Sequence, residues 1–548
     1  MSGEHDVDWV VIGSGFGGSV SALRLAEKGY RVAVLESGRR YEDEDFAKTT
    51  WNARRYYWLP RLGLRGIFRM TLFKDIFVVS GCGVGGGSLG YAQTLYRPQP
   101  GSAFYRDPQW ADLEDWECEL GTHYDVAEHM LGVAQYEGEG PADRLLRELA
   151  EEMGVPETYS TTRVGVFFGE PGETVPDPYF GGEGPPRTGC IRCGACMVGC
   201  RYNAKNTLVK NYLWFAERKG VEIQPERTVA DIRPLGAADG SDGYVVTSEH
   251  SGRWFRKDRR EITAKGVVVA AGALGTNMLL QRCRLGGSLP ELSERIGYLV
   301  RSNSEAITAV TTKDDRHDFT KSVAITSSFY PDENTHVENV TYGRGADSIS
   351  FMFTILTGAG SAFTRPLHWA RSVLRHPIVF ARTLWPFKWS RRTVILLTMQ
   401  TLDNSIRLRP KRNLLGMGPR LQTQEDADKP NPRFIELADT ITRRAAEKLD
   451  ATPQTGVTEA LLNIPTTAHI MGGAVIGEGP DTGVVDSHHR AFGYENLLVC
   501  DGAAIPANIG VNPSLTITAM AEHAMSHVAP RDKVAGAEGA DMDVAGRP

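Results

Sequence analysis

Trp9-Val-Val-Ile-Gly-Ser-Gly-Phe-Gly-Gly18 decides the fold of this 548-residue chain, because it runs from an apolar segment directly into a glycine-rich turn. Small and apolar residues at helical spacing come next, followed by a second apolar segment, Tyr30-Arg-Val-Ala-Val-Leu-Glu36. This order predicts a βαβ unit with two parallel strands. The spacing of Gly13, Gly15 and Gly18 is the G-x-G-x-x-G pattern that opens such a unit in nucleotide-binding domains.

The glycines and Glu36 together predict a site for an adenine dinucleotide. Glycines at these positions permit a tight turn, let the backbone approach a pyrophosphate and allow the helix to pack closely on the strand. An acidic residue at the end of the second strand is placed to bond the ribose hydroxyls. A purely structural glycine turn is the alternative. The presence of strand, helix and Glu36 in register favours the ligand.

Further glycine-rich segments favour a permanently held FAD over an exchangeable nicotinamide cofactor. Gly81–Gly90 is too rich in glycine for a strand interior, and its backbone can wrap closely around a flat ligand. Gly266–Thr276 predicts another buried strand that enters a turn, and the short segment Thr228–Ile232 is expected to join the same sheet. The candidate FAD contacts from these segments are Gly85, Gly86, Gly87, Ser88, Val229, Ala271 and Gly272.

Leu497–Glu522, near the C-terminus, reads as a buried strand, a loop and the start of a helix. Pro513 fits the first helical position, because its missing N–H costs nothing there. The N–H groups that follow form an electropositive helix end, which with Asn512 can stabilise negative charge on a bound ring or a substrate oxygen. We therefore expect Asp501, Gly502, Asn512 and Pro513 at the cofactor.

These motifs and their order resemble the glucose-methanol-choline (GMC) family of FAD oxidoreductases, and within it the cholesterol oxidase-type branch. The resemblance also rests on Gly83–Ser88, Ala270–Gly275, His469-Ile-Met-Gly-Gly473 and Gly510–Pro513. It implies FAD, bound covalently or non-covalently, and a substrate domain with a six-stranded antiparallel sheet. It also implies oxidation of an alcohol by hydride transfer to the flavin.

The expected fold is α/β, with a Rossmann-like FAD-binding domain interleaved with an α+β substrate domain built on an antiparallel sheet. The FAD-binding domain is expected to comprise residues 1–95, 201–299 and 466–527. The cap and substrate domain is expected to comprise residues 96–200 and 300–465. Within the latter, Phe434–Leu449 predicts an amphipathic helix whose apolar side carries Ile435, Ala438, Ile441 and Ala445.

The resemblance also suggests the reaction centre. His469 matches the family's active-site histidine, and an ordinary pKa of about 6.5 suits a base that takes a hydroxyl proton. Asn512 matches the partner that bonds substrate or modulates the flavin. Glu338 is the candidate for the glutamate base of steroid-active members, with an exposed surface glutamate as the equal alternative. Glu305 is a weaker candidate.

Cys190-Ile-Arg-Cys-Gly-Ala-Cys-Met-Val-Gly-Cys200 holds half of the chain's 8 cysteines. Its C-x2-C-x2-C-x3-C spacing is that of bacterial ferredoxins, in which thiolates bind an iron–sulfur cluster. Arg201 replaces the proline of that motif and no second run exists, so at most one cluster can form. Its candidate ligands are Cys190, Cys193, Cys196 and Cys200, or three of these together with a distant ligand.

Zinc, disulfides and ordinary buried thiols are the alternatives for this cysteine run. Zinc usually takes two separated pairs of ligands, and disulfides are disfavoured in the cytoplasm. Some GMC dehydrogenases hold a cluster in a similar motif. A cluster implies a dehydrogenase that passes electrons to a redox carrier protein, and its absence implies an oxidase that uses oxygen.

Charge and aromatic residues indicate a lipophilic substrate. A net charge of −6 and a pI near 6.2 give no sign of nucleic-acid binding. Residues 348–402 contain no Asp or Glu, and their arginines and lysine alternate with aromatic residues; Trp51–Lys74 repeats this pattern. Such a mixture suits an anionic bilayer surface, while a cover over the substrate domain or a protein interface is the equal alternative.

The start of the chain lacks a basic segment followed by an apolar core, and no apolar run is long enough to span a membrane. We therefore expect a cytoplasmic protein that contacts the inner membrane face peripherally. Residues 528–548 have few large apolar side chains and are expected to form a flexible tail. A flavin-dependent lyase or isomerase, or an electron-transfer protein without alcohol oxidation, remains an alternative function.

Overall fold

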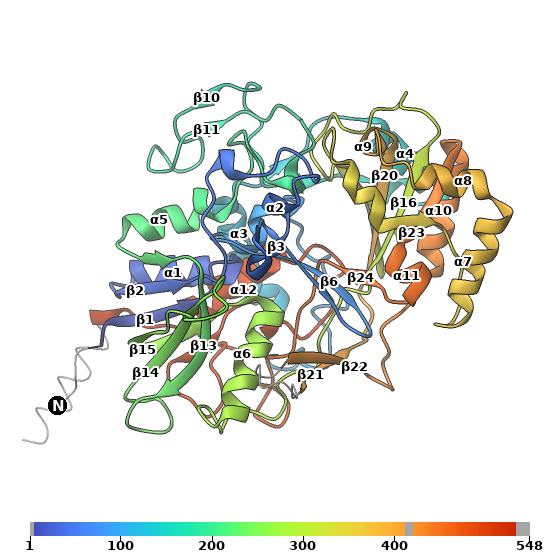
Figure 1. Cartoon of the computed structure of the whole chain (residues 1–548). Helices are drawn as coiled ribbons and strands as arrows, with labels where there is room; N and C mark the ends of the chain where they lie inside the picture. The colour runs from blue at the N-terminus through green and yellow to red at the C-terminus, as the bar shows by residue number, and fades with distance from the viewer. Residues whose placement is uncertain (1–4, 412–419, 533–548) are drawn as a thin grey trace, which may run out of the picture.

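The computed structural model describes residues 5–411 and 420–532, and two seven-stranded sheets organise them (Figure 1). One sheet, at the left of Figure 1, is mostly parallel and carries the nucleotide-binding motifs. The other, at the right, is entirely antiparallel. The α/β fold class and the antiparallel sheet are therefore confirmed.

The first sheet has the order β12-β2-β1-β15-β14-β13, and β25 also pairs with β15. Its parallel strands are β1 (Val7–Ile12), β2 (Val32–Leu35), β12 (Glu222–Gln224), β15 (Arg260–Val269) and β25 (Leu497–Val499). Its antiparallel strands are β13 (Arg227–Pro234) and β14 (Tyr244–His250). The central strands are continuous apolar runs, as expected where helices and loops cover both faces.

Helices α1 (Phe16–Glu27) and α6 (Gly272–Gly286) pack directly on strands of this sheet, and further helices pack on α1. α1 follows β1, and α12 (Ser514–Ser526) packs between α1 and α3 (Trp116–Leu131). α5 (Tyr212–Arg218) packs on α1, whereas α6 follows β15 and packs on β13. The α12 residues are nearly all buried, so this helix is a central element of the core.

The second sheet has the order β19-β23-β16-β20-β18-β17-β8. Its strands are β8 (Ser160–Thr161), β16 (Ala306–Thr312), β17 (Ser327–Asp332), β18 (Thr335–Val340), β19 (Phe353–Ile355), β20 (Thr393–Gln400) and β23 (Ala451–Gly456). Six strands were expected, and the two-residue edge strand β8 makes the seventh. It is added because residues 160–161 pair with the start of β17.

Alternation along β20 gives the second sheet two apolar faces. Ile395 and Leu397 belong to the cluster that faces the first sheet and its loops. Val394 and Leu396 belong to the cluster on the opposite face, against α4 (Pro141–Glu152) and α10 (Glu436–Lys448). Successive residues of a strand point to opposite faces, so this one strand lines a cavity and anchors the helical layer at the same time.

Smaller elements connect the two sheets. The short strands are β3 (Trp58–Leu59), β4 (Leu64–Arg65), β5 (Phe68–Leu72), β6 (Phe77–Gly81), β7 (Ala134–Gln135), β9 (Arg163–Val164), β10 (Thr174–Val175), β11 (Arg187–Thr188), β21 (Ile406–Lys411), β22 (Arg420–Glu425) and β24 (Thr466–Thr467). The remaining helices are α2 (Ala53–Tyr56), α7 (Thr364–Arg375), α8 (Pro377–Thr383), α9 (Trp389–Arg392) and α11 (Val457–Leu462).

The sheets support the proposed division of the chain into two interleaved domains. All strands of the first sheet fall in residues 1–95, 201–299 and 466–527, and all strands of the second fall in the remaining segments.

The start of the predicted tail is bonded to the body, because Arg531 N–H donates to the Lys28 carbonyl at 3.0 Å. Residues 533–548 lie outside the described part.

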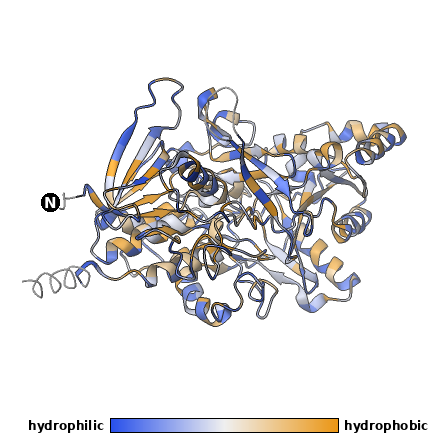
Figure 2. Ribbon diagram, turned by 90° about the horizontal axis from the view of Figure 1, so that it is seen from below, coloured by the Kyte–Doolittle hydropathy of each residue, from blue (hydrophilic) through white to orange (hydrophobic). Residues whose placement is uncertain are grey.

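Helices α7 and α8 lie at the right-hand edge of Figure 1, and the ribbon at that edge of Figure 2 includes residues coloured as hydrophobic. The exposed apolar residues in and beside these two helices are Phe363, Leu367, Leu374, Ile378, Leu384, Trp385 and Phe387. Within the described residues, no helix combines the length and the apolar content that crossing a membrane requires. An exposed apolar face of this extent marks an interaction surface.

Candidate active site

The G-x-G-x-x-G turn is closed so tightly that only glycine fits. Gly13 has φ +102°, and a Cβ there would overlap the carbonyl oxygen of Ala270. A Cβ on Gly18 would overlap the Gly13 carbonyl, so its absence lets α1 pack on the turn. Gly15 is the N-cap residue of α1, with no side chain between the helix N-terminus and a ligand.

Glu36 lies at the end of β2 and is 6% exposed. Its Oε2 accepts from the N–H of Ser14 at 3.1 Å and from the Ser14 hydroxyl at 2.8 Å, and its Oε1 accepts from Gly38 N–H at 2.7 Å. These bonds fix the carboxylate beside the glycine turn. The position is the one that the sequence predicted for a ribose-binding residue, and that role stays a prediction.

The second glycine-rich segment packs directly on the first. A Cβ on Gly86 would clash with the Gly15 Cα, so Gly86 must lack a side chain at this contact. Ser14 Oγ accepts from Gly85 N–H at 3.1 Å. Ser88 Oγ donates to the Gly85 carbonyl at 2.6 Å and accepts from Leu208 N–H at 3.0 Å. The loop is therefore held rigidly over the start of α1.

The C-terminal segment closes the same site from the other side. Asp501 Oδ2 accepts from Gly272 N–H at 2.8 Å and from the Thr276 hydroxyl at 2.5 Å, and Oδ1 accepts from Ala503 N–H at 2.8 Å. Burial raises the pKa of Asp501 to about 6. The sequence predicted Pro513 at the first helical position of α12, and in the structure it is the N-cap residue just before that position. A difference of one residue is usual at helix ends.

One cavity of about 390 Å³ joins these segments to the antiparallel sheet. Its lining includes residues of each glycine-rich segment and of the C-terminal segment: Gly15, Gly87, Ala271, Gly272, Asp501, Gly502 and Pro513. The lining also includes many apolar residues: Phe68, Met197, Ile307, Ile325, Val340, Tyr342, Ile349, Met352, Phe353, Ile395 and Leu397. A backbone cradle without side chains fits a flat ligand such as FAD, whereas Val229 lies at 8% exposure in the edge strand β13 and not in this lining.

His469 and Asn512 also line this cavity. His469 Nδ1 hydrogen-bonds Glu305 Oε1, which leaves Nε2 as its free ring nitrogen. Glu305 Oε2 also accepts from Ala468 N–H at 3.0 Å, and its side chain is completely buried. Burial opposes protonation of the imidazole, but the negative charge and the hydrogen bond of Glu305 outweigh this effect and raise the pKa of His469.

Sequence reasoning gave Glu305 too little weight, because it is far from His469 along the chain. The link is a backbone bridge: Arg301 and Met471 exchange N–H···O bonds of 2.9 Å in both directions. This bridge places residue 305 beside residue 469. No local motif marks Glu305 and His469 as partners, so only knowledge of the backbone pairing could have revealed their contact.

Glu338 is fully buried on β18, so the alternative of an exposed surface glutamate is wrong. Its Oε2 accepts from Asn512 Nδ2 at 3.3 Å, while its Oε1 and the Asn512 Oδ1 have no protein partner. Burial raises the pKa of Glu338 to about 8. The sequence candidates His469, Asn512 and Glu338 therefore meet at one place, with Glu305 as the fourth member.

The cysteine run lies beside the cavity. Cys190, Cys196 and Cys200 pack against one apolar cluster, and Met197 between them reaches the cavity. All four cysteines of the run are free of disulfides. Lys205 is buried and donates to the Cys196 carbonyl at 3.0 Å, and burial lowers its pKa to about 7.

The sulfur spacing argues against a single zinc ion. One tetrahedral zinc holds thiolates about 3.8 Å apart, given Zn–S bonds of about 2.3 Å. Within residues 5–411 and 420–532, the four sulfurs do not supply three ligand atoms within 4.8 Å of one another. A cluster holds its thiolates farther apart, because each thiolate binds its own iron.

Comparison with known proteins identifies the family. The model described as FAD dependent oxidoreductase matches residues 8–337, and that described as GMC oxidoreductase matches residues 406–521. The chain belongs to the GMC family and is an FAD-dependent oxidoreductase that acts on alcohols.

Two curated relatives resemble the chain over nearly its whole length. Cholesterol oxidase of Mycobacterium tuberculosis is 49% identical over 533 residues, which cover 95% of this chain and 91% of the relative. Cholesterol oxidase of Acinetobacter baumannii is 46% identical over 529 residues, covering 96% and 94%. The solved structure of pyridoxine 4-oxidase from Mesorbium loti has the same fold, with TM-score 0.59, 16% identity and coverage of 95% and 99%.

Proposed function

We propose that this protein oxidises the hydroxyl group of a sterol-type or long-chain lipophilic alcohol to a carbonyl group. The observation that carries the proposal is the cavity itself: apolar residues of the antiparallel sheet, the side chains of His469 and Asn512, and residues of the glycine-rich segments all line one space. Bound FAD supplies the acceptor for the hydride that leaves the alcohol carbon. Both cholesterol oxidases that resemble the chain support the substrate class.

His469 removes the hydroxyl proton in this proposal. The bond from Nδ1 to Glu305 fixes the tautomer, so Nε2 offers its lone pair to the alcohol. As the O–H proton passes to Nε2, the electrons of the O–H bond form the carbonyl π bond and the carbon loses hydride. The buried Glu305 carboxylate stabilises the imidazolium that results, so Glu305 is a positioning residue.

Asn512 and Glu338 orient the polar end of the cavity. The Asn512 Nδ2 donates a hydrogen bond to the Glu338 carboxyl group, and this bond fixes the orientation of the Asn512 amide. The Asn512 Oδ1 has no hydrogen-bond partner in the protein. The raised pKa of Glu338, about 8, keeps this carboxyl largely protonated at neutral pH. A protonated Glu338 supplies a donor rather than a second buried negative charge beside Glu305.

The experiment is product analysis with the FAD-loaded chain. Sterols and long-chain alcohols should yield products two hydrogens lighter, with reduction of the flavin, while glucose and small polyols should not. A lyase or isomerase would convert substrate without a net change in the flavin and without this mass loss. Such an outcome would reject the proposed reaction even if a sterol binds.

The cysteine run favours a second element of the proposal, an iron–sulfur cluster that takes electrons from the reduced enzyme. The four thiols are half-buried, Met197 of the same run lines the cavity, and the sulfur spacing argues against the simplest zinc geometry. Backbone N–H groups also face the sulfurs: Arg192 N–H donates to Cys190 Sγ at 3.4 Å. Such donors stabilise the negative charge of cluster thiolates.

Anaerobically prepared protein should contain iron and sulfide, and Cys193→Ser should lose both because one ligand is missing. The cluster should give an electron paramagnetic resonance signal in one redox state, and a small redox protein should outcompete oxygen as acceptor. Cys118→Ser is the matched control, since Cys118 is exposed on α3 and outside the run. Iron-free anaerobic protein that forms peroxide rapidly would instead establish an oxidase without a cluster.

A third element is peripheral contact with an anionic membrane through α7, α8 and the residues that follow. Their exposed apolar side chains stand among Arg371, Arg375 and Arg382, in a stretch with no acidic residue. Each basic side chain near an anionic bilayer contributes about 1 kcal/mol. Not all of the predicted basic and aromatic residues serve here: Arg365 and Trp389 are buried, and Tyr56 and Phe68 line the cavity.

Sedimentation with vesicles of phosphatidylglycerol and phosphatidylcholine tests this contact. The double variant Leu367→Glu, Leu374→Glu should bind at least about tenfold more weakly, because it places charge on the inserted face. Leu285→Glu is the matched control, since Leu285 is 59% exposed on α6. Equal binding of all three proteins would rule out α7 as the membrane-facing element.

A further inference from the structure

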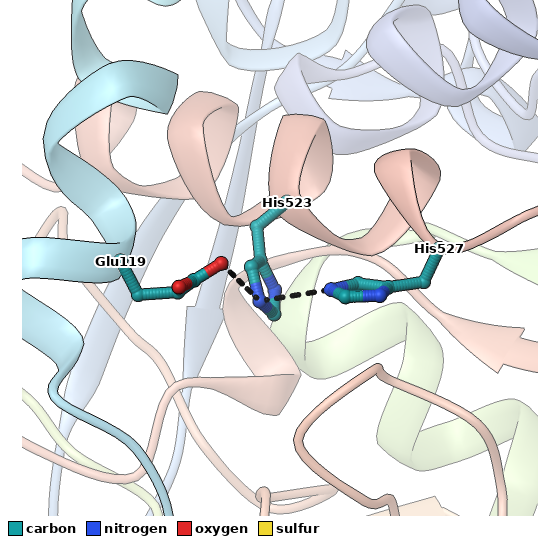
Figure 3. A group of neighbouring side chains, drawn as sticks. All are labelled: Glu119, His523 and His527. Carbon is teal, nitrogen blue, oxygen red and sulfur yellow. Dashed lines mark hydrogen bonds and ion pairs between the residues drawn. The ribbon is translucent and has the colours of Figure 1, made fainter.

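A second group of chemically active side chains lies where α3 meets the end of α12 (Figure 3). Five of the chain's 13 histidines gather there, with ring centroids 3.7 to 6.3 Å from a neighbouring histidine ring. They are His123, His488, His489, His523 and His527. The alcohol oxidation proposed above makes no use of them.

Three ligand atoms converge within this group. His523 Nε2 lies 3.3 Å from His527 Nε2 and 3.6 Å from Glu119 Oε1, and the ligand atoms of the three residues all fall within 4.8 Å of one another. A tetrahedral zinc ion with bonds of about 2.0–2.1 Å holds its nitrogen and oxygen ligands about 3.3 Å apart. The observed spacings therefore match the edges of such a site.

The elements position these atoms independently of any ion. His523 and His527 are four residues apart on α12, so one turn separates them and both project from the same face. Glu119 lies in the first turn of α3. Trp116, in the same turn, packs on His523 with 5.6 Å between the two ring centroids. The Nδ1 of His523 is buried without a partner, so this ring reaches other polar groups only through Nε2.

We propose that Glu119, His523 and His527 bind one Zn²⁺ or a similar divalent transition metal. Two imidazole nitrogens and a carboxylate oxygen are ligands that zinc prefers, and a water would complete the fourth position. Glu119 and His527 are exposed, so the site is open to solvent for metal entry.

The metal would act on the structure and not on the reacting atoms. Nine residues of α12 separate Ser514 from His523, which corresponds to about 14 Å of helix. The ion would join α3 to the far end of the helix whose N-terminus carries Pro513 and, before it, Asn512. Binding it would therefore tie α3 to the C-terminal end of α12, while Asn512 at the other end is held separately by Glu338.

Calorimetric titration of tag-free, chelator-treated, FAD-loaded protein with Zn²⁺ alone tests the site. Glu119→Gln and His527→Ala should each weaken the binding at least about tenfold, the scale of losing a ligand or its support. Both residues are exposed, so the variants should retain FAD and the rate of alcohol oxidation. His368→Ala, an exposed histidine on α7, should bind zinc like the unchanged chain.

Zinc taken up by groups elsewhere in the chain would add to the signal, so the site is defined by the part of the uptake that these two variants lose. Co²⁺ in place of Zn²⁺ should give the visible absorption of a tetrahedral ion with nitrogen and oxygen ligands, absent in both variants. If Glu119→Gln and His527→Ala take up zinc like the unchanged chain, or if no uptake occurs in molar excess, the proposal is wrong and the His523–His527 contact is a hydrogen bond only.

Discussion

Replacing His469 with alanine should slow reduction of the bound flavin by an alcohol at least about 100-fold, the scale of losing a general base. The side chain lines the cavity, and its Nδ1 is already engaged by Glu305, so the free Nε2 is the base nearest the substrate chamber. FAD should remain bound, because the glycine turn and the Gly81–Gly90 loop hold it without His469. Rapid mixing under anaerobic conditions measures the rate directly.

Asn512→Ala should produce a loss of similar size if Asn512 orients the substrate, since removal of one such donor costs about 100-fold or more. His129→Ala is a suitable control, because His129 is exposed on α3 and lies outside the cavity lining. Unchanged reduction rates in His469→Ala would remove His469 from the mechanism, whatever happens to FAD content.

The hydrogen-bonded pair of His469 and Glu305 predicts that the rate of flavin reduction depends on pH. The neutral form of His469 accepts the proton, so the reduction rate should rise as the pH passes upward through the raised pKa of His469. Glu305→Gln removes the negative charge that favours the imidazolium, so that pKa should fall and the acid limb of the profile should move to lower pH. A loss of rate without movement of the limb would show that Glu305 acts only through packing.

The nucleotide-binding half of the fold could be predicted from sequence because its signals are local. Gly13, Gly18 and Glu36 lie in one βαβ unit, and each glycine is required by a backbone contact that the model shows. Helix α10 was predicted for the same reason: apolar residues at helical spacing marked it to within two residues of its observed start.

The catalytic geometry could be predicted only in part. The resemblance to the GMC family pointed to His469 and Asn512, but the Glu305 partnership depends on pairing between segments about 170 residues apart, which no local pattern encodes. The burial of Glu338 follows from the position of β18 between β17 and β20. An isolated strand sequence cannot tell an inward glutamate in a central strand from an outward one at an edge.

The basic and aromatic stretches show where prediction from composition alone fails. Composition alone put Tyr56, Phe68, Trp385 and Phe387 in one class, because all stand among arginines. The structure separates them: Tyr56 and Phe68 line the cavity, whereas Trp385 and Phe387 are exposed. Short helices and turns interrupt the periodicity that would have told the two groups apart.

The substrate class can be tested by the shape of the chamber. A rigid sterol nucleus should reduce the flavin, and Leu397→Trp should lower its reduction efficiency at least about tenfold, because a bulkier side chain overfills the cavity. Leu402→Trp is the matched control, since Leu402 is exposed after β20 and outside the lining. A short alcohol should be affected much less by Leu397→Trp.

The most direct measurement is anaerobic mixing of the FAD-loaded protein with a sterol, followed by the flavin absorbance and by mass analysis of the product. The account predicts complete bleaching in one turnover and one ketone, two hydrogens lighter, for each flavin reduced, with no bleaching by glucose. An oxidised flavin in the presence of saturating sterols and long-chain alcohols, or reduction by a free sugar instead, would contradict it.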